Sequence, residues 1–253
     1  MRRIVGALVV AAFVVGGGGA STGLARAAGP TVTAIDLGTL GGDFSTAVAV
    51  SPSGQVVGES ATAAGPIHAF SWTQSGGMVD LGTLGGPSSS ARGVTPSGQV
   101  VGDSDLPGGG VHAFSWTKAD GMVDLGTLGG TSSLAAAVSP SGQVVGTSQP
   151  AGDPGQHAFS WTQTGGLIDL GTLGGSFSAA VDVNARGQVV GSASLPGNLA
   201  SHAFSWTQKG GMVDLGTLGG THSDADAVNA RGDVVGSNYT TGNAEFHATL
   251  WHT

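Results

Sequence analysis

One heptapeptide, DLGTLGG, occurs five times in this chain of 253 residues. Its copies begin at Asp36, Asp80, Asp124, Asp169 and Asp214, so the steps between them are 44, 44, 45 and 45 residues. Self-similarity at a period of this size is typical of repeat architectures, in which each unit is one supersecondary structure. The chain from residue 31 to residue 253 is therefore predicted to be one domain of five similar units.

The second unit shows the strands that each repeat is expected to contain. Ala91–Val94 and Gln99–Ser104 are joined by the turn TPSG, and this pattern predicts a β-hairpin. His112–Thr117 and Met122–Gly126, joined by KADG, predict a second hairpin. Four short strands without helical periodicity predict an all-β fold, a five-bladed β-propeller of four-stranded antiparallel blades. A β-solenoid or another repeat sheet is the alternative.

The two chain ends predict how such a ring would close. Val32–Leu37 (VTAIDL) has the pattern of a fourth strand but precedes any complete unit. The last unit stops after His247–Trp251 (HATLW), one strand short. The N-terminal strand is therefore predicted to complete the last blade and to leave no open sheet edge there. An open stack would need distinct capping units instead.

The third strand of each unit carries two aromatic positions on one face, because residues two apart in a strand share a face. The first position holds Phe70, Phe114, Phe159 and Phe204, and Thr249 in the last unit. The second holds Trp72, Trp116, Trp161, Trp206 and Trp251. These side chains are predicted to fill the wedge between neighbouring blades. An exposed, sugar-stacking Trp on each blade is the alternative.

Several segments together resemble one known family. The tripeptide HAF begins at His68, His112, His157 and His202, and it recurs in constant order with DLGTLGG and GQVVG. This combination is similar to the bacterial extracellular repeat called the HAF family, and the resemblance covers all five units. It implies an extracytoplasmic repeat protein and no established activity. A looser resemblance to WD-repeat propellers concerns only the order of strands and turns, because the Trp-Asp dipeptide and the Gly-His pair are missing.

Histidine also recurs once per unit, at His68, His112, His157, His202 and His247. A metal site would need several imidazoles at about 2 Å from one ion, and one His on each blade cannot provide that. Each His is therefore predicted to make a structural hydrogen bond, to the recurring Asp or to a turn carbonyl; WD repeats use a His and an Asp in a similar way. The Asp that opens each DLGTLGG is predicted to accept N–H groups of its Gly-rich turn. Neither a metal nor a cofactor is predicted.

The N-terminus has the pattern of a secretory signal peptide. Arg2 and Arg3 precede the apolar run Ile4–Val15, and Ala25–Ala27 suits cleavage before Ala28. The run is too short for a membrane span of about 20 residues. We expect a signal peptide over 1–27, a short linker over 28–30 and a secreted, extracellular protein with no stable membrane anchor.

The charge and the cysteine content of the chain limit the classes of partner and of site that it can have. Three of the eight basic residues precede residue 28 and none of the sixteen acidic ones does, so the mature chain is strongly acidic. This charge disfavours nucleic acid and anionic membranes. The absence of cysteine excludes disulfides and cysteine metal sites. The oligomeric state does not follow from the sequence.

Variation in length is confined to one loop, between the second and third strands. The loop has nine residues in Glu59–Ile67 and Asp103–Val111, and ten in Thr147–Gln156, Ser192–Ser201 and Ser237–Phe246. Variable loops on a rigid scaffold commonly carry binding residues. The loops are predicted to share one face with the TLGG links. The candidate binding residues on this face are Glu59, Asp103, Asp105, Asp153, Asn198, Tyr239 and Glu245.

The positions of the acidic residues bear on whether the chain could be a glycoside hydrolase. Glycoside hydrolysis needs two positioned carboxyl groups. The only glutamates, Glu59 and Glu245, lie in variable loops, and the acids near the innermost strands form no clear pair: Asp43, Asp182, Asp224 and Asp226. The chain is therefore predicted to be a non-catalytic binding or scaffold module for a glycan or a surface protein. The alternatives are a polysaccharide hydrolase or lyase on a five-bladed propeller, or a purely structural extracellular protein.

Overall fold

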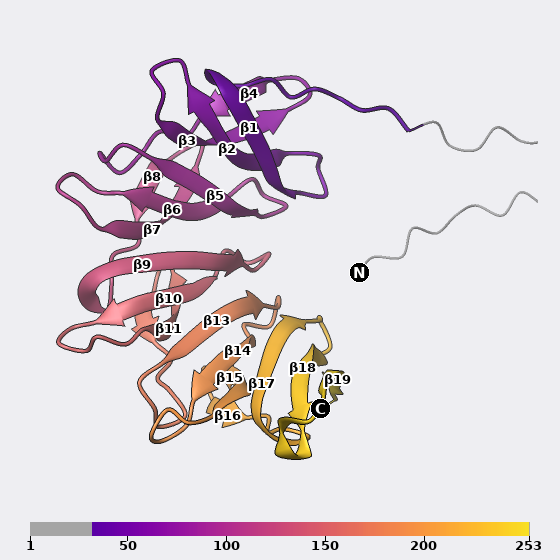
Figure 1. The fold of residues 1–253 in the computed structure, drawn as a ribbon. Coiled ribbons are helices and arrows are strands. Elements are labelled where there is room, and N and C mark those ends of the chain that lie inside the picture. Colours follow the sequence, from indigo (N-terminus) through magenta and orange to yellow (C-terminus); the bar gives the residue numbers. More distant parts are fainter. Residues whose placement is uncertain (1–31, 253) are drawn as a thin grey trace, which may run out of the picture. The chain divides into compact units, whose positions relative to one another are not determined.

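A computed structural model describes residues 32–252 of the chain. The predicted signal peptide and linker lie outside the described residues. Contacts separate the residues up to Asp36 from a compact unit that begins at Leu37. Five groups of strands in this unit follow the five sequence repeats, and the repeats are numbered in that order (Figure 1).

Each repeat contributes consecutive strands to one group. Repeat 1 contains β1 (Gly41–Val50), β2 (Val56–Thr62), β3 (Ile67–Thr73) and β4 (Gly77–Asp80). Repeat 2 contains β5 (Ser89–Val94), β6 (Val100–Asp105), β7 (Val111–Thr117) and β8 (Gly121–Asp124). Repeat 3 contains β9 (Gly129–Val138), β10 (Val144–Pro150), β11 (His157–Thr162) and β12 (Gly166–Asp169). Repeat 4 contains β13 (Ser178–Val183), β14 (Val189–Ser194), β15 (Ser201–Thr207) and β16 (Gly211–Asp214). Repeat 5 contains β17 (Gly219–Val228), β18 (Val234–Thr240) and β19 (Phe246–Trp251).

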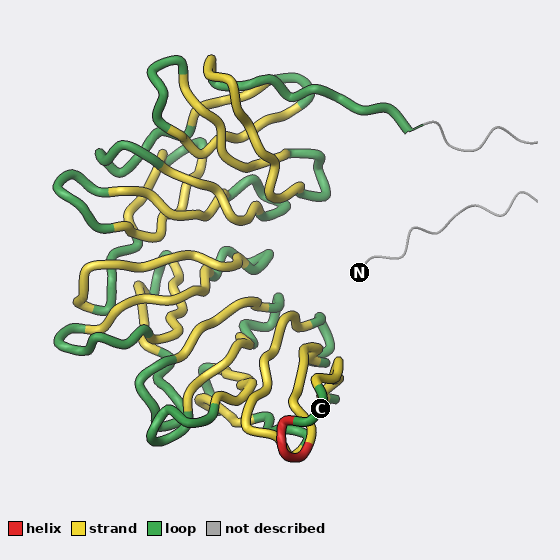
Figure 2. Tube along the Cα trace, in the orientation of Figure 1, coloured by secondary structure: helices red, strands yellow, loops and turns green. Residues whose placement is uncertain are grey.

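The strands of one repeat form an antiparallel meander in chain order, as in β1-β2-β3-β4. Single parallel contacts link neighbouring repeats, for example Val111 with Ser132 and Ser201 with His222. The only helical element among the described residues is a short 3-10 turn at Thr241–Asn243 (Figure 2). The predicted all-β fold of four-stranded antiparallel units is confirmed for repeats 1 to 4.

The glycine of the Val-Val-Gly motif is required by a bulge in the strand beside it. The first strand of each repeat shifts register opposite this glycine, as between Ala91 and Gly93 opposite Gly102. A Cβ atom on Gly102 would lie 2.0 Å from the carbonyl oxygen of Ser90. Any other residue would therefore push the first strand away and break the ladder.

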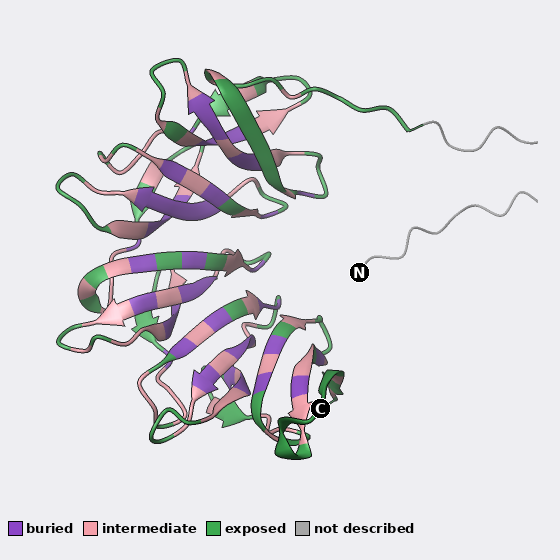
Figure 3. Cartoon of the chain, in the orientation of Figure 1, coloured by how far each residue is buried: buried purple, intermediate pink, exposed green. Residues whose placement is uncertain are grey.

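Apolar clusters fill the interfaces between successive repeats. Between repeats 2 and 3 the cluster contains Val101, Ala113 and Leu125 on one side and Ala135, Val144 and Phe159 on the other. Corresponding clusters join the other successive repeats. The second and third strands are the most buried, and β1 is largely exposed (Figure 3). Burial of these faces is the main stabilising contribution.

Phenylalanine, more than tryptophan, fills the predicted wedge. Phe114, Phe159 and Phe204 are completely buried. Trp116 and Trp161 pack against the same clusters but stay partly exposed, while Trp206 is 9% exposed. The indole rings of Trp116 and Trp161 therefore lie at the margin of their interfaces, whereas Trp206 belongs to the buried cluster.

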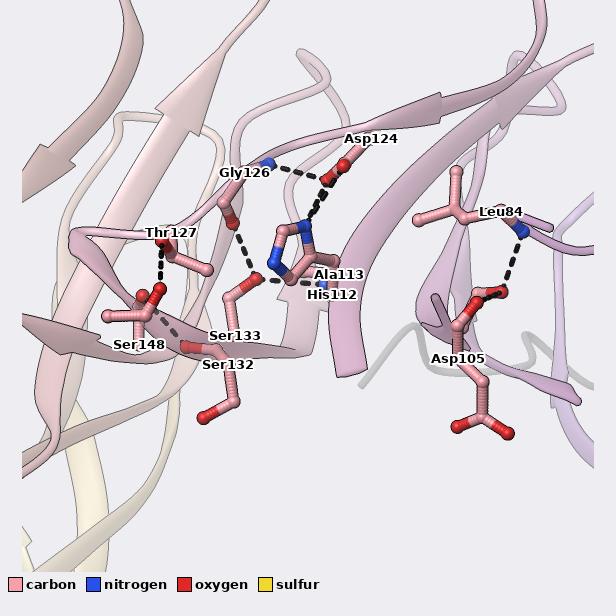
Figure 4. Close-up of polar contacts among 12 residues, drawn as sticks. Leu84, Asp105, His112, Ala113, Asp124, Gly126, Thr127, Ser132, Ser133 and Ser148 are labelled. Atoms are coloured by element: carbon pink, nitrogen blue, oxygen red, sulfur yellow. Dashed lines mark hydrogen bonds and ion pairs between the residues drawn. The ribbon is translucent and has the colours of Figure 1, made fainter. Parts of the chain in front are cut away.

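Buried serine hydroxyls join the repeats at their polar side. Ser133 Oγ accepts the N–H of Ala113 in the preceding repeat at 2.9 Å and donates to Gly126 O at 2.6 Å (Figure 4). Ser89, Ser178 and Ser223 make the same pair of bonds in the other repeats. Each hydroxyl satisfies a backbone donor and a backbone acceptor that the interface would otherwise leave unpaired.

The predicted closing strand begins in a part of the chain that forms a unit of its own, up to Asp36. Residues 32–39 contain no strand, and β19 is paired only with β18 among the described residues. Completion of the last blade by the N-terminal segment stays a prediction.

Replacing Phe159 by alanine should lower the free energy of unfolding by about 3–5 kcal/mol, because the change leaves a cavity in the interface between repeats 2 and 3. Phe177→Ala is the matched control, since Phe177 is 38% exposed; it should cost less than about 1 kcal/mol. Urea unfolding of both variants checks this, and equal losses would contradict the assignment of Phe159 to the core.

Candidate functional site

The loops between the second and third strands lie beside the links of their own repeats, as predicted. The Asn198 side chain accepts the N–H of Ser176 at 2.9 Å, and the Asn243 side chain accepts that of Thr221 at 2.8 Å. Gly86 N–H donates to Asp105 O at 3.2 Å. This end of each repeat, formed by its variable loop and its TLGG link, is called the loop end.

The variable loops are shorter in the structure than in the sequence-based prediction. The connecting residues are 63–66, 106–110, 151–156, 195–200 and 241–245. Glu59, Asp103, Asp105 and Tyr239 were expected in loops and lie instead in strands, because the antiparallel ladder continues beyond the Val-Val-Gly motif. Asp153, Asn198 and Glu245 do lie in loops.

Two of the candidate acids make contacts between repeats. Glu59 accepts the hydroxyl of Ser90 at 2.6 Å. Asp103 is buried, accepts the N–H of Ala135 at 2.8 Å and pairs with Arg92 Nε at 3.0 Å. Burial raises the pKa of Asp103, and the hydrogen bonds from Arg92 and Ala135 oppose this rise. These carboxylates are positioned to hold strands together.

The candidates in the loops make local contacts. Asp153 accepts Gly155 N–H at 2.8 Å, and Glu245 lies 3.0 Å from His247 Nε2. Asn198 has a left-handed φ of 57° and bonds the link through both side-chain groups. These bonds hold the loop backbone in place and leave the loop tips exposed.

Aromatic side chains are the most distinctive exposed groups at the loop end. Four of the seven phenylalanines in the described residues are buried in the third strands, and the other three are exposed: Phe44 42%, Phe177 38% and Phe246 55%. All three lie at the loop end. Phe246 packs on Tyr239 with ring centroids 4.9 Å apart, and His222 meets Tyr239 edge-on at 6.2 Å.

Sequence reasoning missed Phe44, Phe177 and His222. They occupy one position of the link, where repeats 2 and 3 have Ser88 and Ser132. The available signal was this alternation between aromatic residues and serine inside an otherwise constant segment. A position that packing required would not accept both.

The recurring histidines are bonded to the recurring aspartates. His112 Nδ1 lies 2.9 Å from both carboxylate oxygens of Asp124 (Figure 4). Asp124 also accepts Gly126 N–H at 2.7 Å. The other pairs are His68–Asp80, His157–Asp169 and His202–Asp214. His247 contacts Glu245 instead. The carboxylate shapes the turn and the His anchors it to the third strand.

Asp182, one of the inner-strand acids, is bonded to backbone groups. One oxygen accepts the N–H of the next residue, Val183, at 2.8 Å, and the other accepts the N–H of Val228 in repeat 5, also at 2.8 Å. Within residues 32–252, no three His, Cys, Asp or Glu side chains are grouped as a metal site would require. No helix in this described range is long and apolar enough to cross a membrane.

A hollow of 730 Å³ lies at the loop end of repeat 2. It is lined by Gly85, Gly86 and Pro87 of the link and by the loop from Asp105 to Val111. Its walls are mostly backbone and small side chains, so it offers shape and peptide groups instead of charge.

Comparison with known proteins gives structural neighbours only. No protein-family model matches the chain. No curated protein matches it either. Among solved structures, TolB from Acinetobacter baumannii is similar at 14% identity and a TM-score of 0.48, over 82% of this chain and 54% of TolB. This chain thus spans about half the length of TolB. A candidate gluconolactonase is similar at 14% identity and a TM-score of 0.44, over 85% of this chain and 80% of the other.

The buried carboxyl of Asp103 should make stability depend on pH. Because its pKa is raised in the folded protein, its contribution is complete at low pH and is lost as the pH rises through the folded pKa. As the pH rises from about 3, wild type should therefore lose stability relative to Asp103→Asn. Thermal unfolding of both proteins at increasing pH measures the difference. If the melting temperatures of the two proteins change in parallel with pH, the pKa of Asp103 is not raised in the folded protein and the prediction is wrong.

Proposed function

We propose that this chain is a secreted, non-catalytic binding module of the HAF-repeat type, and that its loop end binds a glycan or another extracellular protein. The single observation that carries the proposal is the sorting of phenylalanine. The side chains that build the interfaces are completely or almost completely buried, and every exposed phenylalanine in the described residues lies at the loop end. Exposed aromatic groups are typical of interaction sites.

The scaffold supports display at this end. The loops of repeats 3, 4 and 5 are bonded to the links of their own repeats, as between Asn198 and Ser176. A loop held in this way loses little conformational freedom on binding. Repeated weak sites on one chain would also combine their affinities.

The binding test can use substitutions that the repeats themselves contain. Phe44→Ser and Phe177→Ser introduce the residue found at Ser88 and Ser132, so the fold should tolerate both. On a glycan array, on cell-wall preparations and in capture of extracellular proteins, the double variant should bind at least about tenfold more weakly than wild type, because aromatic anchors dominate interfaces.

Ser88→Ala with Ser132→Ala is the control for changes at the same position. Equal binding by wild type and the phenylalanine variant would overturn the assignment to the loop end. Absence of binding to every probe would favour a purely structural role. Turnover of a polysaccharide in a product screen would favour the hydrolase or lyase alternative.

The five repeats are further proposed to close as a five-bladed propeller. Val235 on repeat 5 is 46% exposed, whereas its counterparts Val57, Val101, Val145 and Val190 are all at 0%. On repeat 1, Ala47 is exposed although its counterpart Ala91 is at 0%. The exposed faces of repeat 1 and repeat 5 therefore carry the same residues that meet each other at the interfaces between successive repeats. Closure would cover both.

Closure predicts that Val235→Asp lowers the melting temperature about as much as Val101→Asp, because both would bury a charge. If repeat 5 keeps an open face, Val235→Asp should change stability by less than about 0.5 kcal/mol. Thermal unfolding at two protein concentrations measures both variants. A small effect of Val235→Asp on the melting temperature would overturn closure. A melting temperature that depends on protein concentration would also overturn it, because it would show that a second copy of the chain covers the face of repeat 5.

A further inference from the structure

Three grooves lie between successive repeats at the opposite end of the strands from the loop end. This turn end carries the turns between the first and second strands and between the third and fourth. The groove between repeats 1 and 2 has a volume of 530 Å³, that between repeats 2 and 3 has 780 Å³, and that between repeats 3 and 4 has 200 Å³. All are lined by equivalent residues, namely the Gln of Gly-Gln-Val-Val, the Ser and Thr beside the Trp, and the Trp of the next repeat.

A glutamine–serine pair forms one wall of each groove. Gln99 Nε2 donates to Ser115 Oγ at 2.9 Å, and Gln143 Nε2 donates to Ser160 Oγ at 2.8 Å. Ser115 is 5% exposed and Ser160 is 3% exposed. Because each serine oxygen accepts the amide, the serine O–H remains free to donate. The bond fixes the amide, so that its oxygen has a defined position.

The amide oxygens of Gln55, Gln99 and Gln143 accept no hydrogen bond from any described residue. A Cβ atom on Gly142, in the next turn, would lie 2.9 Å from Gln99 Oε1. Gly142 has a φ of +90°, a conformation that other residues rarely adopt. Glycine at this position therefore leaves the space beside the amide oxygen open.

Tryptophan adds an unused donor to the same grooves. The indole N–H groups of Trp116, Trp161 and Trp206 have no acceptor within residues 32–252. In repeat 5, by contrast, Trp251 Nε1 donates to Leu215 O at 2.9 Å. The N–H groups of the other three indoles are not among the buried atoms without a partner, so they are open to solvent and to a ligand.

The grooves adjoin one another. Gln99 and Thr117 line both the first and the second groove, and Thr162, Gly165 and Gln208 line both the second and the third. A single extended ligand could therefore follow all three. A repeating polymer is the simplest ligand that can meet the same side chains at each interface.

The charged residues of the grooves differ. The first groove has Lys118, the second has Asp120 and the third has Arg186. The shared groups are neutral: an amide oxygen, a serine hydroxyl, a threonine and an indole. A donor beside an acceptor suits the hydroxyl groups of a sugar ring, each of which can donate and accept at once.

From this arrangement we infer that the turn-end grooves form a second binding site, which takes a neutral polysaccharide chain. A peptide would present one kind of backbone group along its length but a different side chain at each repeat, which the constant lining does not match. The site lies at the opposite end from the exposed phenylalanines and does not depend on the loop-end proposal.

The test titrates the mature chain with neutral oligosaccharides: the hexamers of cellulose, xylan, mannan, starch and laminarin. All five tryptophans occupy the one recurring position, so binding should shift the intrinsic fluorescence, and calorimetry gives the affinity. We expect at least one hexamer to bind. Gln99→Leu with Gln143→Leu removes two amide acceptors and should weaken this binding by about tenfold or more.

Gln188→Leu is the matched control. Gln188 makes the same bond to Ser205 at 2.9 Å, but its Oε1 already accepts Asn184 Nδ2 at 3.0 Å. The control should lose stability like the other glutamine variants and change affinity less than about twofold. The melting temperature of each variant shows whether a loss of affinity comes from a folding defect. Trp161→Phe keeps an aromatic ring but removes the indole N–H, so this variant should stay folded and bind the oligosaccharide more weakly.

Three results would overturn the inference. These are failure of every hexamer to bind a folded protein, equal affinity of wild type and the Gln99/Gln143 variant, and binding of peptides alone in the grooves. The Phe44/Phe177 variant should keep its hexamer binding. Loss of hexamer binding in that variant alone would assign the glycan to the loop end, which overturns the groove site and supports the loop-end proposal.

Discussion

A buried serine hydroxyl holds each repeat to the one before it, and the remaining contacts depend on this bond. Ser133 bridges the N–H of Ala113 and the carbonyl of Gly126, so the third strand of one repeat and the first strand of the next keep a fixed relation. Asp124 shapes the turn between them and His112 anchors that turn. Beside this fixed link, Phe159 packs in the cluster that joins repeats 2 and 3.

The same constraint divides the molecule into two ends with different properties. At the loop end, variation in length and aromatic content is tolerated because the loop tips are exposed and lie outside the apolar clusters between repeats. At the turn end, the glutamine, serine and tryptophan are the same in repeats 1 to 4 because they belong to the strands and turns that form the interfaces. The varied loop end suits a specific ligand, and the repeated groups of the turn end suit a ligand with a repeating structure.

Much of the site could be anticipated from the sequence, and the remainder depended on geometry. The His–Asp pairing followed from recurrence, because a charged group kept in every copy of a glycine-rich turn must have a partner. Variable sequence at Glu59 and Asp103 predicts loops, yet the antiparallel ladder continues through both positions. Their carboxylates are accommodated by partners in the neighbouring repeat, Ser90 and Ala135, which the sequence of one repeat does not reveal. Phe177 was overlooked because the link containing it is otherwise constant.

The sequence by itself determined the repeat, its four short strands, the turns between them and the buried face of the third strand, because alternation and turn chemistry are local properties. Tertiary structure decided which atoms remain unused. Gln188 Oε1 is bonded to Asn184 of its own turn, whereas the open space beside Gln99 Oε1 depends on Gly142 of the next repeat. Tertiary structure also decides whether residues 32–37, which have the sequence of a strand, become one, because a strand requires a partner edge as well as a pattern.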